Sequence, residues 1–193
     1  IAGLLNDGYV GGPSIKPYQP SGYYVNLNFP ERDYYASKGQ DQYRRGLYMH
    51  WQRTFMHPML SAFDAPSREE CTADRFQSNS PQQALTLLND PSFVEAAQGF
   101  ATRLLANEQL QSDDKRLLYA VECAVGRVAK PEELKSLQSF LSQQRDYYKS
   151  KPEEAQAFLK FIAKPATKPV EELAAWAQTC RVILNLHETL TRY

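Results

Sequence analysis

Residues 78–107, SNSPQQALTLLNDPSFVEAAQGFATRLLAN, decide the fold class, because helical signals begin abruptly within them. Ser80 is followed by Pro81 and then by Gln83. A serine three residues ahead of a glutamine forms a capping box, and proline fits the first turn of a helix, where its missing N–H costs nothing. The pattern predicts a short helix over about residues 81–88.

A second helix start follows at Asp90 and Pro91, and the residues after it repeat with helical spacing. This helix is predicted over about residues 91–106. Its apolar side chains recur at intervals of three and four residues, which places them in one stripe along the helix. The stripe consists of Phe93, Val94, Ala97, Phe100, Ala101, Leu104 and Leu105.

Helical signals continue to the end of the chain. Ser112 is a suitable cap for a helix with Asp113 and Asp114 in its first turn and Gly126 at its end. KPEE occurs twice and KPVEE once, and each joins a first-turn proline to glutamates that suit the positive end of the helix dipole. The predicted helices cover about 113–126, 131–149, 152–162 and 169–190. The last is predicted to bury Leu173, Trp176, Ala177, Cys180, Ile183, Leu184 and Leu190.

The first eighty residues differ in composition. They contain seven of the nine glycines, eight of the twelve tyrosines and all three methionines, but no long stripe with helical spacing. Two segments favour short strands, YYVNLNF at 23–29 and YRRGLYMHWQRTF at 43–55. Side chains alternate along the second predicted strand, so its two faces would differ. One face would carry Leu47, Met49 and Trp51, and the other Tyr48, His50 and Gln52.

These patterns predict a mainly α protein. A bundle of about five or six helices spans residues 81–193, and an irregular arm rich in Pro, Gly and Tyr, with at most one short hairpin, spans residues 1–80. We expect the arm to wrap the bundle as part of one domain, because alone it would not offset the conformational entropy that it loses on ordering. The first twelve residues resemble a helix end that leaves through glycines, so we expect a fragment of a longer protein.

Charge and composition exclude several partners. The 22 basic and 22 acidic residues cancel, and they do so separately within 1–80 and within 81–193. A nucleic-acid partner is not expected, because such surfaces carry a basic excess. Membrane insertion is not expected either, because no run of about 18 apolar residues occurs.

The three cysteines do not form a recognisable motif. Cys71, Cys123 and Cys180 lie far apart, without CxxC or CxxCH, so no zinc knuckle and no covalent haem site is expected in this chain. One disulfide with a free thiol and three free thiols both remain open.

The stretch FDAPSREECTADR, residues 63–75, contains six charged side chains and a cysteine. Arginine forks bind carboxylate and sulfate groups, so this stretch and the arginines before it are a candidate site for an acidic or sulfated polysaccharide. The alternative is that these arginines pair with nearby acids, Asp41, Asp64, Glu69, Glu70 and Asp74, and fix the junction between arm and bundle. The candidate residues are Arg44, Arg45, Arg53, Asp64, Arg68, Cys71 and Arg75.

Catalytic and metal chemistry have less support. Neighbouring arginines favour the thiolate of Cys71, but neighbouring carboxylates oppose it, and no family-type cysteine signature surrounds it. We predict no catalytic residue and no metal centre. His50 and His57 remain the candidate metal ligands, because they lie among three methionines in MHWQRTFMHPM. His187 falls on the apolar stripe of the last predicted helix, so a structural role is expected for it.

Five ordered motifs carry a family resemblance. They are GGPSIKPYQP at 11–20, YRRGLYMHWQRT at 43–54, FDAPSREECT at 63–72, NSPQQALTLLNDPSFVEAA at 79–97 and LNLHETLTRY at 184–193. Together they closely resemble the planctomycete C-terminal domain of unknown function, the PSD family.

The chain departs from that family's pattern in two places. Asp74 and Gln77 stand where the family commonly has arginine, which weakens an obligatory anion site. The closing motif has His187, Glu188 and Thr189, where the family often has Asn or Asp, then Glu, then Phe. The family therefore does not usually have histidine at this position, which argues against His187 as a family-wide ligand.

The resemblance implies a location and partners but no reaction. Such domains end large proteins that often carry a companion planctomycete domain, a cytochrome-c-like haem module and an export signal. It therefore implies a periplasmic or cell-surface location, with other domains of the same protein as partners and haem, if any, outside this chain.

Three hypotheses of function follow. The first is a non-catalytic interaction or scaffold module. The alternatives are a polysaccharide-binding domain acting through residues 44–75, or part of a composite hydrolase or redox enzyme.

Overall fold

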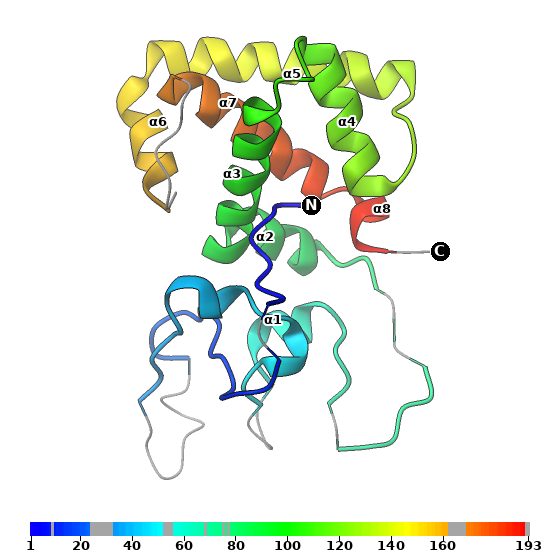
Figure 1. Cartoon of the computed structure of the whole chain (residues 1–193). Helices are drawn as coiled ribbons and strands as arrows, with labels where there is room; N and C mark the ends of the chain where they lie inside the picture. The colour runs from blue at the N-terminus through cyan, green and yellow to red at the C-terminus, as the bar shows by residue number, and fades with distance from the viewer. Residues whose placement is uncertain are drawn as a thin grey trace. The chain divides into compact units, whose positions relative to one another are not determined.

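The computed structural model describes two compact units (Figure 1). The helical unit comprises Ile1–Gly3 and Leu87–Tyr193, and the front unit comprises Leu4–Thr86. The predicted wrapping of the arm around the bundle concerns the placement of the two units and stays a prediction. The described residues are 1–8, 10–23, 33–51, 56–67, 69–74, 76, 78–161 and 169–191.

The prediction of a mainly α fold is confirmed for the described residues. Helix α2 (Pro81–Asn89) begins in the front unit and ends in the helical unit. The helical unit continues with α3 (Pro91–Ala106), α4 (Asp113–Val125), α5 (Pro131–Ser150), α6 (Pro152–Phe158), the 3₁₀ turn η3 (Leu159–Phe161), α7 (Val170–Leu184) and α8 (His187–Leu190).

Helix α7 forms the centre of the helical unit. Five consecutive residues, Leu173 to Ala177, are buried, so this helix is covered on every side rather than along one stripe. It packs chiefly on α3 and α5, and less extensively on α4 and α6. Fully burying each large apolar side chain contributes about 1.5–3 kcal/mol. Such side chains include Trp176, Phe100, Leu104, Leu117, Leu141, Leu173 and Ile183.

The predicted starts of α2 and α3 are confirmed. At α2, the Gln83 amide donates to Ser80 Oγ at 3.2 Å, and the Ser80 amide donates to Gln83 Oε1 at 3.3 Å. This reciprocal pair is the predicted capping box. At α3, Asp90 Oδ1 accepts from the Ser92 amide at 2.9 Å.

Helix α4 also begins and ends as predicted. Ser112 Oγ accepts from the Lys115 amide at 3.3 Å, which satisfies one open donor of the first turn. Gly126 ends the helix with φ 73°, and its amide donates to the Glu122 carbonyl at 2.9 Å. A left-handed residue at this position favours glycine, because a side chain there would be strained.

The prediction of one helix at the end of the chain is wrong. Between α7 and α8, Leu186 is extended with ψ 136°, which breaks the helical path. Thr189 Oγ1 donates to the Ile183 carbonyl at 2.9 Å, one of the last four carbonyls of α7, which also accepts from the Leu186 amide at 3.2 Å. His187 therefore begins α8 instead of continuing the stripe of α7, and Leu190 is 39% exposed instead of buried.

The front unit is irregular. Its described elements before α2 are the 3₁₀ turns η1 (Gly39–Tyr43) and η2 (Gly46–Tyr48) and the short helix α1 (Pro58–Ala62). The predicted strand over 43–55 is wrong for its described part, 43–51, where one isolated parallel bridge joins Ile15 and Met49. The strand fails because the Tyr48 and Met49 amides donate within the turn, to the Arg45 carbonyl at 2.9 Å and the Gly46 carbonyl at 3.1 Å.

Two further predictions concern the remaining segments. The predicted strand 23–29 lies outside the described residues except for Tyr23, which is in a turn. In the described part of the chain, the helices are too short or too polar to cross a lipid bilayer.

Candidate functional site

Arg44 is the most informative of the candidate residues. Arg44 is buried, with only 7% of its surface exposed. Its Nη1 donates to the Pro13 carbonyl at 3.0 Å, and its Nη2 donates to the Gly11 carbonyl. The guanidinium carbon lies 3.8 Å from the centre of the Tyr48 ring, a cation–π distance. Arg44 therefore joins two segments of the front unit through carbonyls and an aromatic ring.

Asp64 ends helix α1 in a conformation that glycine usually provides. Its φ is 56°, and its amide donates to the Ser61 carbonyl at 3.2 Å. The next amide, of Ala65, donates to the Leu60 carbonyl at 2.9 Å. These two bonds form a Schellman motif with Asp64 in the left-handed position, and Pro66 follows as is common after such an end.

The carboxylate of Asp64 has a second role. Its Oδ2 accepts from the Ser78 amide at 2.8 Å, from Ser78 Oγ at 2.7 Å and from Gln83 Nε2 at 3.1 Å. Asp64 therefore ties the two ends of the segment 65–77 together at the start of α2. This arrangement explains FDAPSREECTADR as the end of one helix followed by a loop that leads into the next.

The remaining candidates of this stretch are spread along that loop or lie outside the description. Cys71 is exposed, as are its acidic neighbours Glu69, Glu70 and Asp74. Arg45 is exposed on the other segment. Arg44 and Asp64 lie in separate hydrogen-bonded clusters. Arg53, Arg68 and Arg75 lie outside the described residues.

The candidate metal ligand His57 has a structural role. The residue is 4% exposed, and its Nδ1 accepts from the Met59 amide at 3.2 Å, which caps α1 ahead of Pro58. His50 is half-buried, and its amide donates to the Ile15 carbonyl at 2.7 Å. Over the described residues, His, Cys, Asp and Glu side chains do not gather in threes at metal-binding distance.

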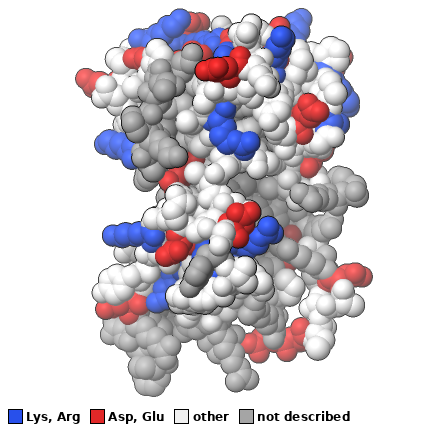
Figure 2. All heavy atoms as spheres, viewed as in Figure 1, with Lys and Arg blue, Asp and Glu red and all other residues white. Residues whose placement is uncertain are grey.

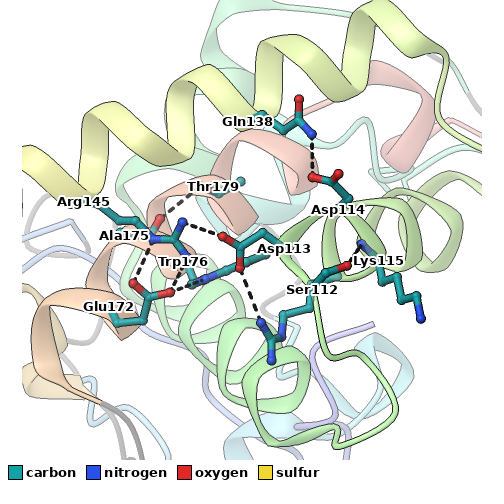
Figure 3. Close-up of polar contacts among 11 residues, drawn as sticks. Ser112, Asp113, Asp114, Lys115, Gln138, Arg145, Glu172, Ala175, Trp176 and Thr179 are labelled. Atoms are coloured by element: carbon teal, nitrogen blue, oxygen red, sulfur yellow. Dashed lines mark hydrogen bonds and ion pairs between the residues drawn. The ribbon is translucent and has the colours of Figure 1, made fainter.

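A polar cluster that sequence reasoning missed lies in the helical unit (Figure 3). Arg145 of α5 donates from Nε to Glu172 Oε2 at 2.8 Å and from Nη2 to Glu172 Oε1 at 2.5 Å. Its Nη1 donates to Asp113 Oδ2 at 2.5 Å. One arginine thus joins α5 to α7 and to the first turn of α4, in the forked geometry that suits carboxylates.

Trp176 completes this cluster. Its side chain is fully buried, and its Nε1 donates to Glu172 Oε1 at 2.9 Å. A buried indole N–H requires an acceptor, and a glutamate one turn earlier on the same helix supplies it. Glu172 therefore serves both the core tryptophan and Arg145. A further contact between α4 and α5 runs from Gln138 Nε2 to Asp114 Oδ1 at 2.5 Å (Figure 3).

The electrostatics of this cluster suit a structural clamp. The hydrogen bond from Arg145, opposed by burial, lowers the pKa of Asp113, and Arg116 adds a weaker contact at 3.4 Å. The hydrogen bonds that Arg145 donates to Glu172 and then to Asp113 raise the pKa of Arg145. Two cations face two carboxylates, and these shifts hold Asp113 and Arg145 more firmly in their charged forms. General acid–base catalysis requires the opposite, a pKa moved toward neutrality.

A second arginine, Arg127, forms a similar cluster at the start of α5 in the helical unit. It donates to both oxygens of Glu133 at 2.8 and 2.9 Å and to both oxygens of Glu188 at 2.8 and 3.0 Å. The Lys130 amide also donates to Glu133, at 2.7 Å, as part of the cap of α5. Bonds from Arg127 and then from Lys130 lower the pKa of Glu133 to about 2. The cluster attaches α8 to the start of α5.

The three cysteines are free thiols in different environments. Cys180 is completely buried in α7, and this burial raises the pKa of its thiol. Cys123 is half-buried in α4. His187 Nε2 lies 3.2 Å from Thr191 Oγ1 within the last turn of the chain.

The sequence contained part of the signal for the Arg145 cluster. The Glu171–Glu172 pair was correctly placed in the first turn of the last long helix, and Trp176 follows Glu172 by one turn. Arg145, however, is 27 residues from Glu172 and 32 from Asp113. Nothing in local spacing identifies such a partner.

Surface charge is mixed on the face shown in Figure 2. Lys and Arg side chains alternate with Asp and Glu side chains there, and the described residues do not form a broad area of one sign. The expectation of no nucleic-acid partner stays a prediction based on this balance.

Comparison with known proteins identifies the family. A family model named PSD1, a protein of unknown function (DUF1553), matches residues 1–141 of the 193. The closing motif at 184–193 lies beyond the matched residues, so that part of the resemblance stays a prediction. Curated proteins gave no match to this chain, and neither did solved structures. Because the match covers well over half of the sequence, the chain belongs to the PSD1 family.

Proposed function

We propose that this chain is a non-catalytic interaction module. It serves the other domains of an exported, cytochrome-c-associated protein of planctomycete type, at the periplasm or cell surface. Any haem belongs to another domain of that protein. The chain binds its neighbouring domains and performs no chemistry of its own.

The supporting observation is how the candidate polar residues are used. Arg44 donates to backbone carbonyls, His57 caps α1, and Asp64 holds the start of α2. In the helical unit, Arg127 and Arg145 each bind two carboxylates. Polar residues whose types would suit catalysis, ligand binding or metal binding therefore have structural partners here. This is the pattern expected of a scaffold.

The polysaccharide hypothesis for residues 44–75 loses one of its five arginines. Arg44 is buried, and its two terminal nitrogens are directed at Pro13 and Gly11. A sulfate on the surface would have to displace those contacts. Arg45 is exposed, and Arg53, Arg68 and Arg75 lie outside the described residues, so a glycan site within 44–75 stays the alternative hypothesis.

The proposal is tested with the longer protein that contains this chain. The chain and the rest of that protein are produced separately and mixed, and binding is measured by calorimetry. We expect a stable complex, a haem absorption band confined to the rest of the protein, and no turnover by the isolated chain in an activity screen.

Two results would overturn the proposal. One is the absence of any complex between the two parts. The other is turnover by the chain or the complex that Cys71→Ser abolishes and Cys123→Ser leaves intact, which would support a composite enzyme instead.

A further inference from the structure

Helix α8 (His187–Leu190) has little buried surface. None of its four residues is buried, whereas each of the helices α3 to α7 buries at least one. Leu190 is 39% exposed, and so is Leu186 just before the helix. A helix of four residues is not stable by itself, because nucleating its first turn costs more than its few hydrogen bonds return. Helix α8 therefore depends on its contacts with the rest of the helical unit.

The junction between α7 and α8 has the features of a hinge. Helix α7 ends at Leu184, and Leu186 is extended with ψ 136°, so helical hydrogen bonding does not run from one helix into the other. The Leu186 amide and Thr189 Oγ1 both donate to the Ile183 carbonyl, at 3.2 Å and 2.9 Å. Hinges are commonly a few residues at the end of an element, where the backbone turns without disrupting its neighbours.

Arg127 attaches α8 to the start of α5 through two carboxylates of unequal support. It donates to both oxygens of Glu188, at 2.8 Å and 3.0 Å. Within the part of the chain that the structure describes, Glu188 accepts from Arg127 alone, whereas Glu133 accepts from Arg127 and also from the Lys130 amide. The Glu188 side chain is 49% exposed, against 36% for Glu133. The contact with Glu188 is therefore the one expected to break first.

Separation at Glu188 would leave the rest of the helical unit in place. Arg127 would keep Glu133, so the start of α5 would keep its cap. The hydrophobic core reaches Ile183 and the partly buried Leu184 but includes nothing from α8. Helix α8 is in contact with α4 and with α7 (Figure 1), so its departure would uncover the parts of those helices that it now covers.

From these observations we propose that α8 is a detachable strap, with Leu186 as its hinge and the Arg127–Glu188 pair as its latch. In the closed form α8 covers adjoining parts of α4 and α7, and in the open form it uncovers them while the bundle stays folded. Salt weakens an exposed ion pair, and a charged neighbour can compete for either partner, so both control the strap. The device does not depend on the proposed interaction role of the chain.

The test is residue-resolved hydrogen exchange of the full chain at low urea concentrations. The probes are the Thr189 and Thr191 amides, which donate to the Leu186 and His187 carbonyls at 2.9 Å and 3.0 Å, with the Trp176 and Ile183 amides of α7 as the reference. Local opening of α8 exposes little surface, so we expect its exchange to be nearly independent of urea. Exchange in α7 requires unfolding of the bundle and should accelerate steeply with urea.

The latch is tested by Glu188→Ala. We expect this substitution to accelerate exchange of the α8 amides about fivefold. Raising NaCl from about 0.1 M to about 1 M should accelerate the same amides in the unaltered chain but not in Glu188→Ala, where the pair is already absent. Glu154→Ala is the matched control, because Glu154 forms an ion pair with Lys151 and its side chain is 50% exposed, but it lies on α6. It should leave α8 exchange unchanged.

Three results would overturn the proposal. The first is a urea dependence of α8 exchange equal to that of α7, because α8 would then open only when the whole unit unfolds. The second is α8 exchange at the rate of an unprotected amide in the unaltered chain, which would mean that no latch holds the helix. The third is an unchanged rate in Glu188→Ala, or an equal acceleration in Glu154→Ala. These measurements do not involve the rest of the longer protein, so this proposal and the proposed function fail separately.

Discussion

Arg145 of the helical unit and Arg44 of the front unit are stabilised in different ways. In the helical unit, Arg145 binds Asp113 and Glu172, whereas in the front unit Arg44 binds the carbonyls of Gly11 and Pro13. The difference follows from the backbone. Helices use most of their carbonyls internally, so Arg145 binds side-chain acceptors, whereas Arg181 of α7 reaches the Leu88 carbonyl, one of the last four of α2. Irregular segments leave carbonyls open, and a buried guanidinium can satisfy them.

This comparison separates two uses of charge. The carboxylate partners of Arg145 are about one-third exposed, so salt and water weaken those ion pairs. Arg44 is buried against neutral acceptors and an aromatic ring, where water competes less. Arg145 therefore connects helices in the helical unit, whereas Arg44 connects irregular segments in the front unit.

The largest expected effect comes from removing the centre of the helical unit. A chain that stops after Leu141, where the family match ends, lacks α7 and its eight buried residues. Each large apolar residue among them contributes about 1.5–3 kcal/mol, against a total stability of about 5–15 kcal/mol. We expect the far-UV circular dichroism of the shortened chain to show no cooperative thermal unfolding of the helical unit.

A chain that stops after Thr191 is the control and should unfold like the full chain. Native-like protection of α3 amides in the shorter chain, measured by hydrogen exchange, would contradict the central role of α7.

Arg44→Met tests the front unit. The substitution leaves the Gly11 and Pro13 carbonyls without these donors and removes the charge over Tyr48, so we expect a loss of about 2–4 kcal/mol. Hydrogen exchange should show lost protection at the Ile15 and His50 amides, which bridge the same segments.

Arg45→Met is the matched control, since Arg45 is its exposed neighbour. Its stability should change by no more than about 0.5 kcal/mol. Equal effects of the two substitutions would remove the structural role assigned to Arg44.

Arg145→Met tests the helical unit. Glu172 would lose its cation, Asp113 would keep only the weaker contact with Arg116, and both remain partly solvated, so the expected loss is smaller, about 1–2 kcal/mol. Urea unfolding followed by circular dichroism measures it. Lys149→Met, an exposed position on the same helix, should leave the unfolding midpoint unchanged. A midpoint that is also unchanged for Arg145→Met would mean that the cluster contributes nothing.

The smallest effect concerns pH. The pKa of Glu133 is lowered from 4.5 to about 2, and the pKa of Glu188 is also lowered, in both cases chiefly by Arg127. Lowered carboxyl pKa values stabilise the folded state above about pH 4.5, and this contribution is lost as the pH falls toward 2. Arg127→Met should therefore flatten the decline of the urea midpoint over that range. An unchanged decline would assign it to other groups.

The sequence predicted the helices much better than the front unit. Helix starts depend on neighbours within one turn, as at Ser80–Gln83 and Ser112–Lys115, and local spacing identifies them. The strand predicted at 43–55 failed because alternation alone does not reveal that the Tyr48 and Met49 amides are used within a turn. The break before α8 depends on contacts outside its own segment, including the Glu188–Arg127 pair, which spans 61 residues.

The candidate site illustrates the same limit. Arg44, Asp64 and His57 were singled out because of their chemistry, but their partners are set by tertiary folding. Asp64 even takes the left-handed position normally filled by glycine, for which the following Ala65–Pro66 was the available hint. Arg145 carried no local signal at all.

The contrast between carbonyl-bound and carboxylate-bound arginine is tested most directly by salt. Unfolding free energies of Arg44→Met, Arg145→Met and the unaltered chain are compared at about 0.1 M and about 1 M NaCl, where the Debye length falls from about 10 Å to about 3 Å. We predict that the cost of Arg145→Met falls substantially with added salt, whereas the cost of Arg44→Met stays the same. A cost of Arg44→Met that falls in parallel with that of Arg145→Met would contradict the account.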